Sequence, residues 1–260
     1  VIHFESLKFI HDNEKKPFFS YLPITIPLAA MQCPDEDVAP FRKKFPHFED
    51  KIGKYSHGTK VKNPVAAFAG MMTRMDRGIG QVLDLLDELK IADNTLVIYA
   101  SDNGRGPGRI PEQKIRGRKL STYEGGIRVP LMIHWPGVTQ AGSVCNEPVL
   151  SQDFYSTLAS EIGVQGADIP QNDGVNLLPL IKGEQQKLPS RALFWHYPHY
   201  YPRMTPASAV RDGNWKLIHY YEDDRVELFD LENDRSERTN LATTYPTRAK
   251  ELKQQLDQWR

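Results

Sequence analysis

The spacing of apolar side chains predicts one long helix and several shorter ones. From Asn63-Pro64 to Leu89, apolar residues recur at steps of three and four, which places them on one stripe of a helix. The same spacing predicts three shorter helices, over residues 4–10, 150–162 and 246–259. Residues 23–63 hold many Pro, Lys and His residues without any period, so we expect a long surface excursion there.

Three continuous apolar runs predict strands, at residues 17–22, 95–100 and 129–135. The run at 95–100 shows no alternation of apolar and polar residues, which is typical of a strand covered on both faces in a parallel, helix-flanked sheet. It follows the long helix after a turn, as in the second half of a β–α–β unit. The sequence therefore predicts an α/β fold.

The composition shifts after about residue 189, where short segments replace the long apolar patterns. Four of these segments predict strands, at residues 192–196, 208–211, 215–221 and 226–231. Asp212-Gly213 and Asp223-Asp224 lie between them as turn signals, so we expect a small antiparallel sheet. The sequence accordingly predicts two domains, residues 1–189 and residues 190–260.

Composition and charge exclude several classes of protein. The 260 residues are 40% apolar and carry 33 Lys and Arg against 33 Asp and Glu, as in an ordinary globular protein. No run is long and apolar enough to span a membrane. The balanced charge and the absence of a recognition motif argue against nucleic-acid binding. Two cysteines, Cys33 and Cys145, are too few for a disulfide framework, and the sequence leaves open whether they pair.

Candidate chemistry begins at the end of the 95–100 strand, where Ser101-Asp102-Asn103-Gly104 follows. In open α/β sheets, ligands bind beyond the carboxyl ends of the strands. The side chains of Asp102 and Asn103 offer the hard oxygen ligands that Ca²⁺ and Mg²⁺ prefer. The same residues are also a turn signal, and one carboxylate alone does not hold a divalent cation.

A second candidate lies in residues 116–130, just before the 129–135 strand. Four cations stand there near the pair Gly125-Gly126: Arg116, Arg118, Lys119 and Arg128. Lys and Arg are suited to clamp a tetrahedral oxyanion, whereas the alternative is a solvated basic loop.

These residues resemble a known family. Residues 97–104 together with 119–130 look like the second signature region of the sulfatases. Further stretches resemble other parts of the same family in the right order, at residues 17–23, 196–200, 209–217 and 227–231. The resemblance covers nearly the whole chain.

The resemblance implies an alkaline-phosphatase-like fold and hydrolysis of sulfate esters. The expected fold class is α/β, with a partial alkaline-phosphatase-like sheet flanked by helices, and a small C-terminal antiparallel sheet packed with a terminal helix. Sulfatases use a Cys or Ser oxidised to formylglycine, within a Cys-x-Pro-x-Arg motif, beside a bound Ca²⁺. Asp102 and Asn103 match the family's two later metal ligands, and Lys119 matches the lysine that contacts the sulfate and the leaving group. A divalent ion and an ammonium both neutralise the charge that develops on sulfuryl oxygens.

The expected substrate is a sulfate ester, with a sulfated carbohydrate as one candidate. Lys119, Arg116, His196 and His199 are the expected substrate-binding residues. For the two histidines a structural role is the equal alternative. Family members of this kind are commonly exported, so the expected location is periplasmic or secreted.

The chain also departs from the family pattern. Neither Cys33 nor Cys145 opens a Cys-x-Pro-x-Arg motif, and no Asp pair ends a first strand. The nucleophile and the first two metal ligands are therefore expected from an N-terminal part that this chain, which begins at Val1, lacks. Where relatives read Pro-His after the 17–22 run, this chain reads Pro27-Leu28, and Leu28 cannot donate a proton to a leaving group.

Three hypotheses remain open from the sequence. The first is the C-terminal portion of a sulfatase, inactive as an isolated chain. The second is a non-catalytic protein that binds a sulfated glycan on a sulfatase scaffold. The third is a phosphoesterase of the same superfamily, because phosphoryl and sulfuryl transfer need similar stabilisation of charge.

Overall fold

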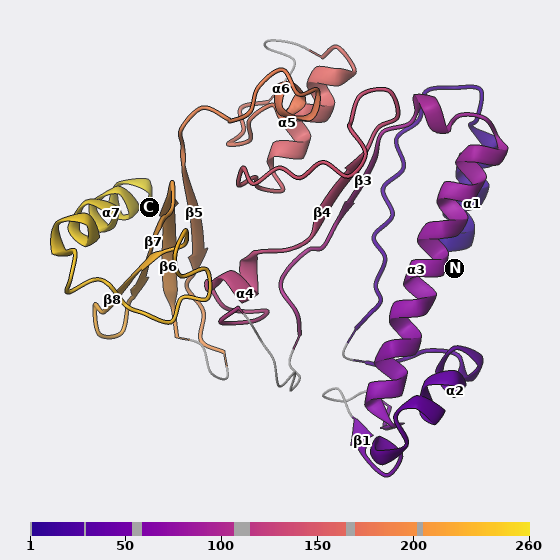
Figure 1. Ribbon diagram of the computed structural model, residues 1–260, viewed down its shortest axis with the longest axis horizontal. Helices are drawn as coiled ribbons and strands as arrows, with labels where there is room; N and C mark the ends of the chain where they lie inside the picture. The colour runs from indigo at the N-terminus through magenta and orange to yellow at the C-terminus, as the bar shows by residue number, and fades with distance from the viewer. Residues whose placement is uncertain (1, 29, 54–58, 107–114, 165–169, 202–204) are drawn as a thin grey trace. The chain divides into compact units, whose positions relative to one another are not determined.

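The computed structural model describes residues 2–28, 30–53, 59–106, 115–164, 170–201 and 205–260 (Figure 1). The chain forms two compact units, residues 1–96 and residues 97–260. The predicted domain boundary after residue 189 stays a prediction. Among the described residues, no helix combines the length and the apolar character needed to cross a bilayer.

The first unit is built on helices. Its elements are α1 (Ile2–Asp12), α2 (Asp35–Lys44), the 3₁₀ turn η1 (Pro46–Phe48), β1 (Ile52–Gly53), β2 (Val61–Lys62), α3 (Pro64–Glu88) and the 3₁₀ turn η2 (Ala92–Asn94). The short strands β1 and β2 pair antiparallel. Helix α2 packs on the start of α3 around a small core of Val38, Ala66 and Ala67.

The long helix confirms the prediction made from its apolar stripe. It begins where Asn63 Oδ1 accepts a hydrogen bond from the Ala66 amide at 3.0 Å, with Pro64 in the first turn. It ends at Glu88 with Leu89 as the C-cap residue, after which Lys90 takes a left-handed conformation with φ of 59°. Helix α1 confirms the predicted helix at 4–10.

Two predictions for the first unit are wrong. Residues 17–22 form no strand, and the Phe19 and Tyr21 side chains are 72% and 77% exposed. A strand needs a hydrogen-bonded neighbour, and no described segment pairs with this one. Residues 23–63 are also more regular than expected, because they include α2. This helix escaped detection since its sequence is mostly charged, with acidic residues in its first turn and basic residues in its last.

The second unit contains two sheets and four helices in its described part. Its elements are β3 (Val97–Ala100), α4 (Glu124–Ile127), β4 (Leu131–His134), α5 (Asp153–Glu161), α6 (Leu178–Ile181), β5 (Ala192–Tyr197), β6 (Ala207–Asp212), β7 (Trp215–Tyr220), β8 (Val226–Asp230) and α7 (Pro246–Trp259). Strands β5 to β8 form a four-stranded antiparallel sheet in sequence order, and α7 ends the chain. The predicted small sheet and terminal helix are confirmed, as is the mixed α/β class.

The predicted parallel sheet is a further correction. Among the described residues, β3 pairs only with β4, and the two run antiparallel, with Val97 opposite His134 and Ala100 opposite Leu131. An apolar run shows that a strand is covered, but it does not encode the direction of the neighbouring strand. Strand β3 is also only half-buried, with Ala100 exposed.

The C-terminal sheet has two different apolar faces, because side chains alternate along each strand. On one face, Val210, Leu217 and Leu228 pack against α7. The other face carries Ala209, Ile218 and Phe229, and Tyr123 from the loop before α4 packs against it. Figure 1 shows α7 and α4 on opposite sides of this sheet.

Candidate functional site

The tip of β3 presents the two predicted metal ligands side by side. Asp102 is exposed, and its Oδ1 accepts a hydrogen bond from the Asn103 amide at 2.8 Å. The Asn103 Nδ2 donates to the Gly104 carbonyl at 2.9 Å. Among the described residues, no donor reaches Asp102 Oδ2 or Asn103 Oδ1. Two hard oxygens therefore remain available for a ligand.

The loop that carries Lys119 docks directly onto this tip. The Lys119 amide donates to the Arg105 carbonyl at 2.8 Å, and the Gly104 amide donates to the Gly126 carbonyl at 2.8 Å. The Ser101 amide donates to the Pro130 carbonyl at 3.3 Å. The backbone after β3 and the backbone from Lys119 to Pro130 thus run side by side.

Three glycines make this close docking possible. A Cβ atom on Gly104 would lie 2.0 Å from the Gly125 carbonyl oxygen. A Cβ on Gly125 would lie 2.4 Å from the Arg116 oxygen, and one on Gly126 would lie 2.1 Å from the Ser121 oxygen. Each neighbouring atom belongs to the backbone, so a side chain at any of these positions would push the two segments apart.

Lys119 is a cation whose side chain this docking leaves free. Its side chain is exposed, and it forms no ion pair or hydrogen bond with any other described residue. Its backbone is held next to Arg105, three residues after Asp102. The structure therefore brings the segments that carry Asp102, Asn103 and Lys119 together at one junction. These adjoining segments carry an ammonium, which can pair with an anion, and two hard oxygens, which suit a divalent cation.

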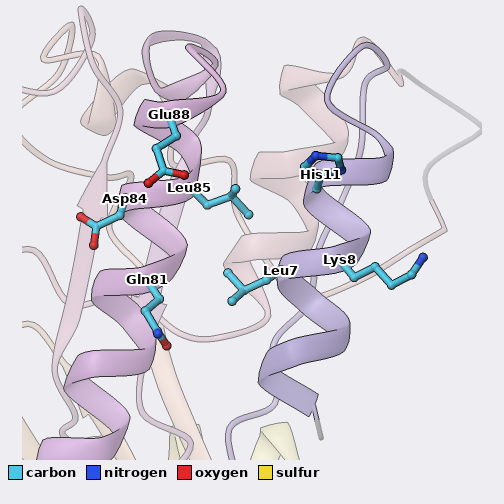
Figure 2. A pocket seen from close by; sticks show the side chains of 7 residues that line it. All are labelled: Leu7, Lys8, His11, Gln81, Asp84, Leu85 and Glu88. Carbon is cyan, nitrogen blue, oxygen red and sulfur yellow. The ribbon is translucent and has the colours of Figure 1, made fainter.

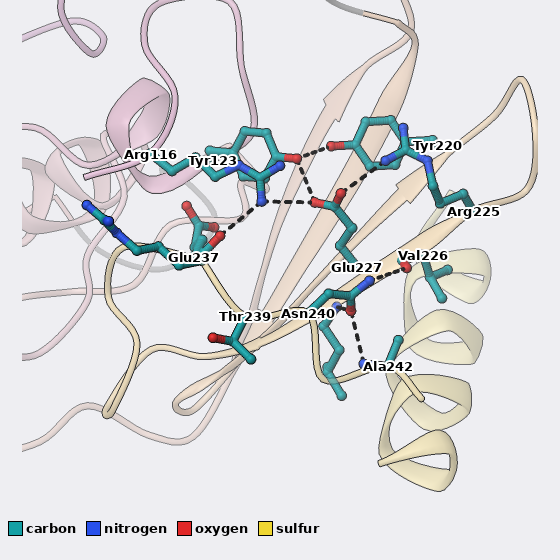
Figure 3. Close-up of polar contacts among 12 residues, drawn as sticks. Arg116, Tyr123, Tyr220, Arg225, Val226, Glu227, Glu237, Thr239, Asn240 and Ala242 are labelled. Atoms are coloured by element: carbon teal, nitrogen blue, oxygen red, sulfur yellow. Dashed lines mark hydrogen bonds and ion pairs between the residues drawn. The ribbon is translucent and has the colours of Figure 1, made fainter. Parts of the chain in front are cut away.

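Arg116 occupies a different position from Lys119. Its Nη1 donates to the Glu237 carbonyl at 2.9 Å and lies 3.6 Å from Glu227 Oε2. Its guanidinium stacks on the Tyr123 ring at 4.1 Å (Figure 3). Arg116 thus ties its loop to the C-terminal sheet.

The structure does not bring His196 to the Lys119 loop. His196 lies on β5, its Nδ1 is 2.6 Å from Ser208 Oγ, and its ring is edge-on to Trp259 of α7. It therefore stands on the α7 face of the sheet, whereas Tyr123 packs on the opposite face. His199 lies beyond the end of β5, exposed and edge-on to Tyr197 at 5.4 Å.

Leu28, Cys33 and Cys145 are all among the described residues. Leu28 belongs to the first unit and is 47% exposed. Cys33 and Cys145 are both free thiols, and Cys33 Sγ lies 4.0 Å from Asp37 Oδ2.

Sequence reasoning missed a buried ionic cluster behind the Lys119 loop. The Lys216 ammonium is fully buried and lies 2.9 Å from Glu124 Oε1 and 2.8 Å from Glu237 Oε1. The Glu124 amide donates to Glu237 Oε2 at 2.6 Å. A signal did exist, since Lys216 alternates with Trp215 and Leu217 along β7 and therefore points to a sheet face where an apolar residue is expected.

The two carboxyl groups of this cluster differ electrostatically. Burial favours the neutral acid in both, but for Glu124 the charges of Lys216, Arg211 and Arg128 outweigh it and hold its pKa below the usual value. For Glu237 burial prevails and raises the pKa, although Lys216 acts in the opposite direction. The difference follows from the contacts, because Glu124 also has Arg128 within 3.4 Å.

A second polar network joins Tyr123 and Tyr220 to Glu227 (Figure 3). The Tyr123 hydroxyl donates to Glu227 Oε2 at 2.6 Å, and since it has one proton, the Tyr220 hydroxyl donates to Tyr123, also at 2.6 Å. Burial, with Glu227 and Tyr220 adding to it, raises the pKa of Tyr123 far above its usual value. Tyr123 thus stays a neutral donor that fixes the loop on the sheet.

The residues at the β3 tip fit a hard divalent cation in donor type but do not complete its coordination. Ca²⁺ takes six to eight oxygen ligands, and Asp102 and Asn103 supply two. No cluster of three or more His, Cys, Asp or Glu side chains suited to a metal occurs in the described part of the chain.

A separate groove lies in the first unit, between α1 and α3 (Figure 2). Its volume is about 410 Å³, and it is lined by Leu7, Lys8, His11, Gln81, Asp84, Leu85 and Glu88. None of the candidate site residues lines it.

Comparison with known families gives two overlapping matches that together span almost the whole chain. The model described as Sulfatase matches residues 4–164, and the model described as N-sulphoglucosamine sulphohydrolase, C-terminal, matches residues 118–260.

Similar individual proteins carry sulfatase names. A sulfatase from Formosa agariphila is 32% identical over 92% of this chain and 45% of its own length. Human steryl-sulfatase is 32% identical over 76% of this chain and 31% of its own length. The chain thus spans less than half the length of these relatives.

Solved structures agree with the sequence matches. The crystal structure of Ps i-CgsB matches 99% of this chain and 53% of its own, with a TM-score of 0.81 and 28% identity. The same protein has been solved in complex with k-i-k-neocarrahexaose. A structure in complex with its substrate D-glucosamine-2-N,6-O-disulfate matches 76% of this chain and 40% of its own, with a TM-score of 0.58 and 28% identity.

Proposed function

The chain belongs to the sulfatase family, and from this premise we propose that the protein hydrolyses sulfate esters at the junction of Asp102, Asn103 and Lys119. The observation that carries the proposal is the pair of backbone hydrogen bonds, Gly104 to Gly126 and Lys119 to Arg105, that holds the two segments together. The proposed roles of the three side chains follow from their chemistry.

Lys119 is proposed as the catalytic cation. Hydrolysis of a sulfate ester moves negative charge onto the sulfuryl oxygens and the leaving oxygen. An exposed ammonium with three rotatable N–H donors can follow that charge as it forms. Because the anion desolvates Lys119 on binding, the interaction becomes stronger than it is in water.

Asp102 and Asn103 are proposed to hold a divalent cation, Ca²⁺ being the expected ion. When bound, such an ion supplies Lewis-acid stabilisation of the sulfuryl oxygens. Asp102→Ala is expected to weaken Ca²⁺ binding by on the order of tenfold or more, because it removes the only carboxylate of the pair. Titration calorimetry measures this, with Asp173→Ala as an exposed control. Unchanged affinity in Asp102→Ala would remove the residue from the metal site.

The isolated chain of 260 residues is proposed to be inactive, because it contains no Cys-x-Pro-x-Arg motif. The test compares this chain with the protein expressed from its own gene, using 4-nitrophenyl sulfate and 4-nitrophenyl phosphate. We expect turnover of the sulfate by the expressed protein and none by the isolated chain. Hydrolysis by the isolated chain would contradict its proposed inactivity, and preference for the phosphate would favour a phosphoesterase.

The proposed substrate class is a sulfated carbohydrate. Support comes from the two similar proteins solved with carbohydrate ligands. The test is a panel of sulfated mono- and oligosaccharides assayed for free sulfate next to 4-nitrophenyl sulfate. A kcat/KM for the best saccharide above that for the aryl ester supports this class, whereas a uniform preference for aryl esters contradicts it.

One observation favours a second candidate, a non-catalytic protein that binds sulfated glycans. Leu28 stands where the resemblance leads one to expect His, and its side chain has no proton to give to a leaving group. This candidate predicts measurable binding of a sulfated oligosaccharide with no release of sulfate. Release of sulfate by the expressed protein would exclude it.

A further inference from the structure

We propose that Lys216, on the C-terminal sheet, is a positioning residue that holds the Lys119 loop and the β3 tip in register. Its effect on turnover rests on the proposed function, whereas its effect on the loop does not. Lys216 is not proposed to touch the substrate, because its side chain is fully buried.

The contacts of Lys216 bind three separate segments at one point. Lys216 belongs to β7, Glu124 is the first residue of α4, and Glu237 lies in the turn after β8. The ammonium lies within 2.9 Å of both carboxylates. Glu237 in turn accepts the Glu124 amide at 2.6 Å, so the triangle is closed.

From this triangle, a short run of hydrogen bonds leads to the site. Two residues after Glu124, the Gly126 carbonyl accepts the Gly104 amide, and Gly104 directly follows Asn103. Within α4, the Gly125 amide donates to the Arg116 carbonyl at 2.7 Å, three residues before Lys119. A shift of α4 along the sheet would therefore move the Asn103 and Lys119 backbones.

The burial of charged side chains in the Lys216 cluster, where apolar ones would fit, itself suggests that the cluster fixes the position of α4. Burying two carboxylates and an ammonium carries a desolvation penalty, and apolar residues of similar volume usually stabilise a fold as well or better. Tyr123 already supplies apolar contact between loop and sheet, since it packs against Phe229. Apolar contact tolerates sliding, whereas an ammonium held between two carboxylates fixes α4 in one place.

A second set of contacts, made by Arg116 and Tyr123, also holds the Lys119 loop on the sheet. Its effect can be told apart from that of the Lys216 cluster. Arg116 and Tyr123 are tied to Glu237 and Glu227 by the contacts drawn in Figure 3. These contacts hold the loop against the sheet without touching Lys216. Removing the Lys216 charge is therefore expected to loosen α4 and leave the loop attached.

The first test measures hydrogen exchange of the Gly104, Lys119 and Gly125 amides in Lys216→Met. The Met side chain is similar in length to that of Lys but carries no charge. We expect these three amides to exchange about tenfold faster or more, while amides within β6 and β7 keep their protection. The control is Leu252→Ala, which opens the core on the α7 face of the same sheet and should leave the three amides as they are in the unchanged protein.

The second test measures turnover in the protein expressed from its own gene. We expect Lys216→Met to lower kcat on the order of 10²-fold, with a smaller change in KM, because Lys119 is placed to meet charge that forms in the transition state. Leu252→Ala should keep kcat within about twofold, since a general loss of stability does not move the site.

If Lys216→Met does not fold, Glu237→Gln replaces it in the hydrogen-exchange test. It keeps the volume of the side chain and leaves the Glu124–Lys216 pair in place, so we expect the same three amides to exchange faster by a smaller factor. Unchanged exchange of Gly104, Lys119 and Gly125 in the folded variant overturns the proposal. If the unchanged protein hydrolyses no sulfate ester, the proposed function fails, and the exchange result still decides the role of Lys216.

Discussion

Gly104, Gly125 and Gly126 allow two backbones to approach more closely than any other residue type would permit. The Gly104 position is the tightest of the three, since an added Cβ would lie 2.0 Å from the Gly125 carbonyl oxygen. The same hydrogen-bonded contact joins the predicted metal ligands to the Lys119 loop. Because Gly104 has no Cβ, the β3 tip can pack against the Lys119 loop, and this contact brings the proposed metal ligands next to that loop.

Gly104→Ala is therefore expected to destabilise the second unit by about 1–3 kcal/mol and to lower activity, because the β3 tip and the Lys119 loop must separate. Thermal unfolding and 4-nitrophenyl sulfate turnover measure the two effects. Gly106→Ala is the matched control, since a Cβ there meets nothing within 4 Å and should change stability by less than about 0.5 kcal/mol. Equal stabilities of the two variants would contradict the close approach.

Motif order was sufficient to predict which residues flank the junction, but not where every candidate side chain lies. Asp102 and Lys119 are near one another along the chain, within segments that the family resemblance aligns. His196 is different, because its face depends on strand register, and shifting a strand by one residue moves every side chain to the other face. The Lys216 cluster escaped because its partners, Glu124 and Glu237, are far apart in the sequence and meet only in the fold.

At the level of elements, α3 shows how far local sequence determines structure. Asn63 is buried, has φ of 48°, and caps the helix through Oδ1. Its Nδ2 donates to the Phe45 carbonyl at 2.9 Å and to Glu49 at 3.0 Å. One residue therefore starts the helix and joins it to η1.

Asn63→Ala is expected to destabilise the first unit by about 2 kcal/mol, since it removes the cap and places a Cβ-bearing residue without local hydrogen bonds in the left-handed region. Chemical denaturation measures the loss. Asn63→Ser keeps a side-chain oxygen that can cap the helix and adds no charge beside Glu49, so it should lose less. The account of the cap would be wrong if Asn63→Ser were as unstable as Asn63→Ala.

The contact between α2 and α3 is expected to weaken in acid. Asp37 is buried and accepts hydrogen bonds from Arg77 and, at 2.7 Å, from Arg74. Burial raises the Asp37 pKa, but the two arginines outweigh it and hold the pKa below its usual value. A carboxylate with a lowered pKa stabilises the fold fully above its unfolded pKa of about 3.9, and this contribution is lost as the pH falls below that value.

Asp37→Asn should therefore lower the free energy of unfolding by about 1–2 kcal/mol at pH 7, a modest value because both arginines remain partly exposed. The difference from the unchanged protein should shrink at pH 3. Urea titrations at the two pH values measure this, and Asp35→Asn, on the exposed side of α2, is the control. A difference that stays constant between pH 7 and pH 3 would contradict the ionic origin.

Each error in the predicted elements has a physical cause of its own. Helix α2 has few apolar residues, so its periodicity is weak, and its charges match the helix dipole instead. Residues 17–22 have a strand-like composition, but composition does not supply a pairing partner. The β3–β4 direction is likewise a property of two segments together. Long amphipathic patterns and turn-bounded short strands, by contrast, located α3, α7 and the four-stranded sheet.

At the scale of the second unit, the C-terminal sheet acts as a support with two occupied faces. Helix α7 covers one face with Ala249, Leu252 and Leu256. The other face receives the Lys119 loop through the Lys216 cluster and the Tyr123 network. The overlap of the two family matches at residues 118–164 fits this arrangement, because the loop belongs to both regions.

The measurement that bears most directly on the proposed site is the kcat of Lys119→Met for 4-nitrophenyl sulfate at saturating Ca²⁺, in the protein expressed from its own gene. The matched control is Lys187→Met, which removes an exposed ammonium outside the junction. If the Lys119 ammonium meets the developing charge, kcat falls about 10²–10³-fold in Lys119→Met and stays unchanged in Lys187→Met, with equal thermal stabilities. A Lys119→Met protein that turns over at the rate of the unchanged protein would contradict the site.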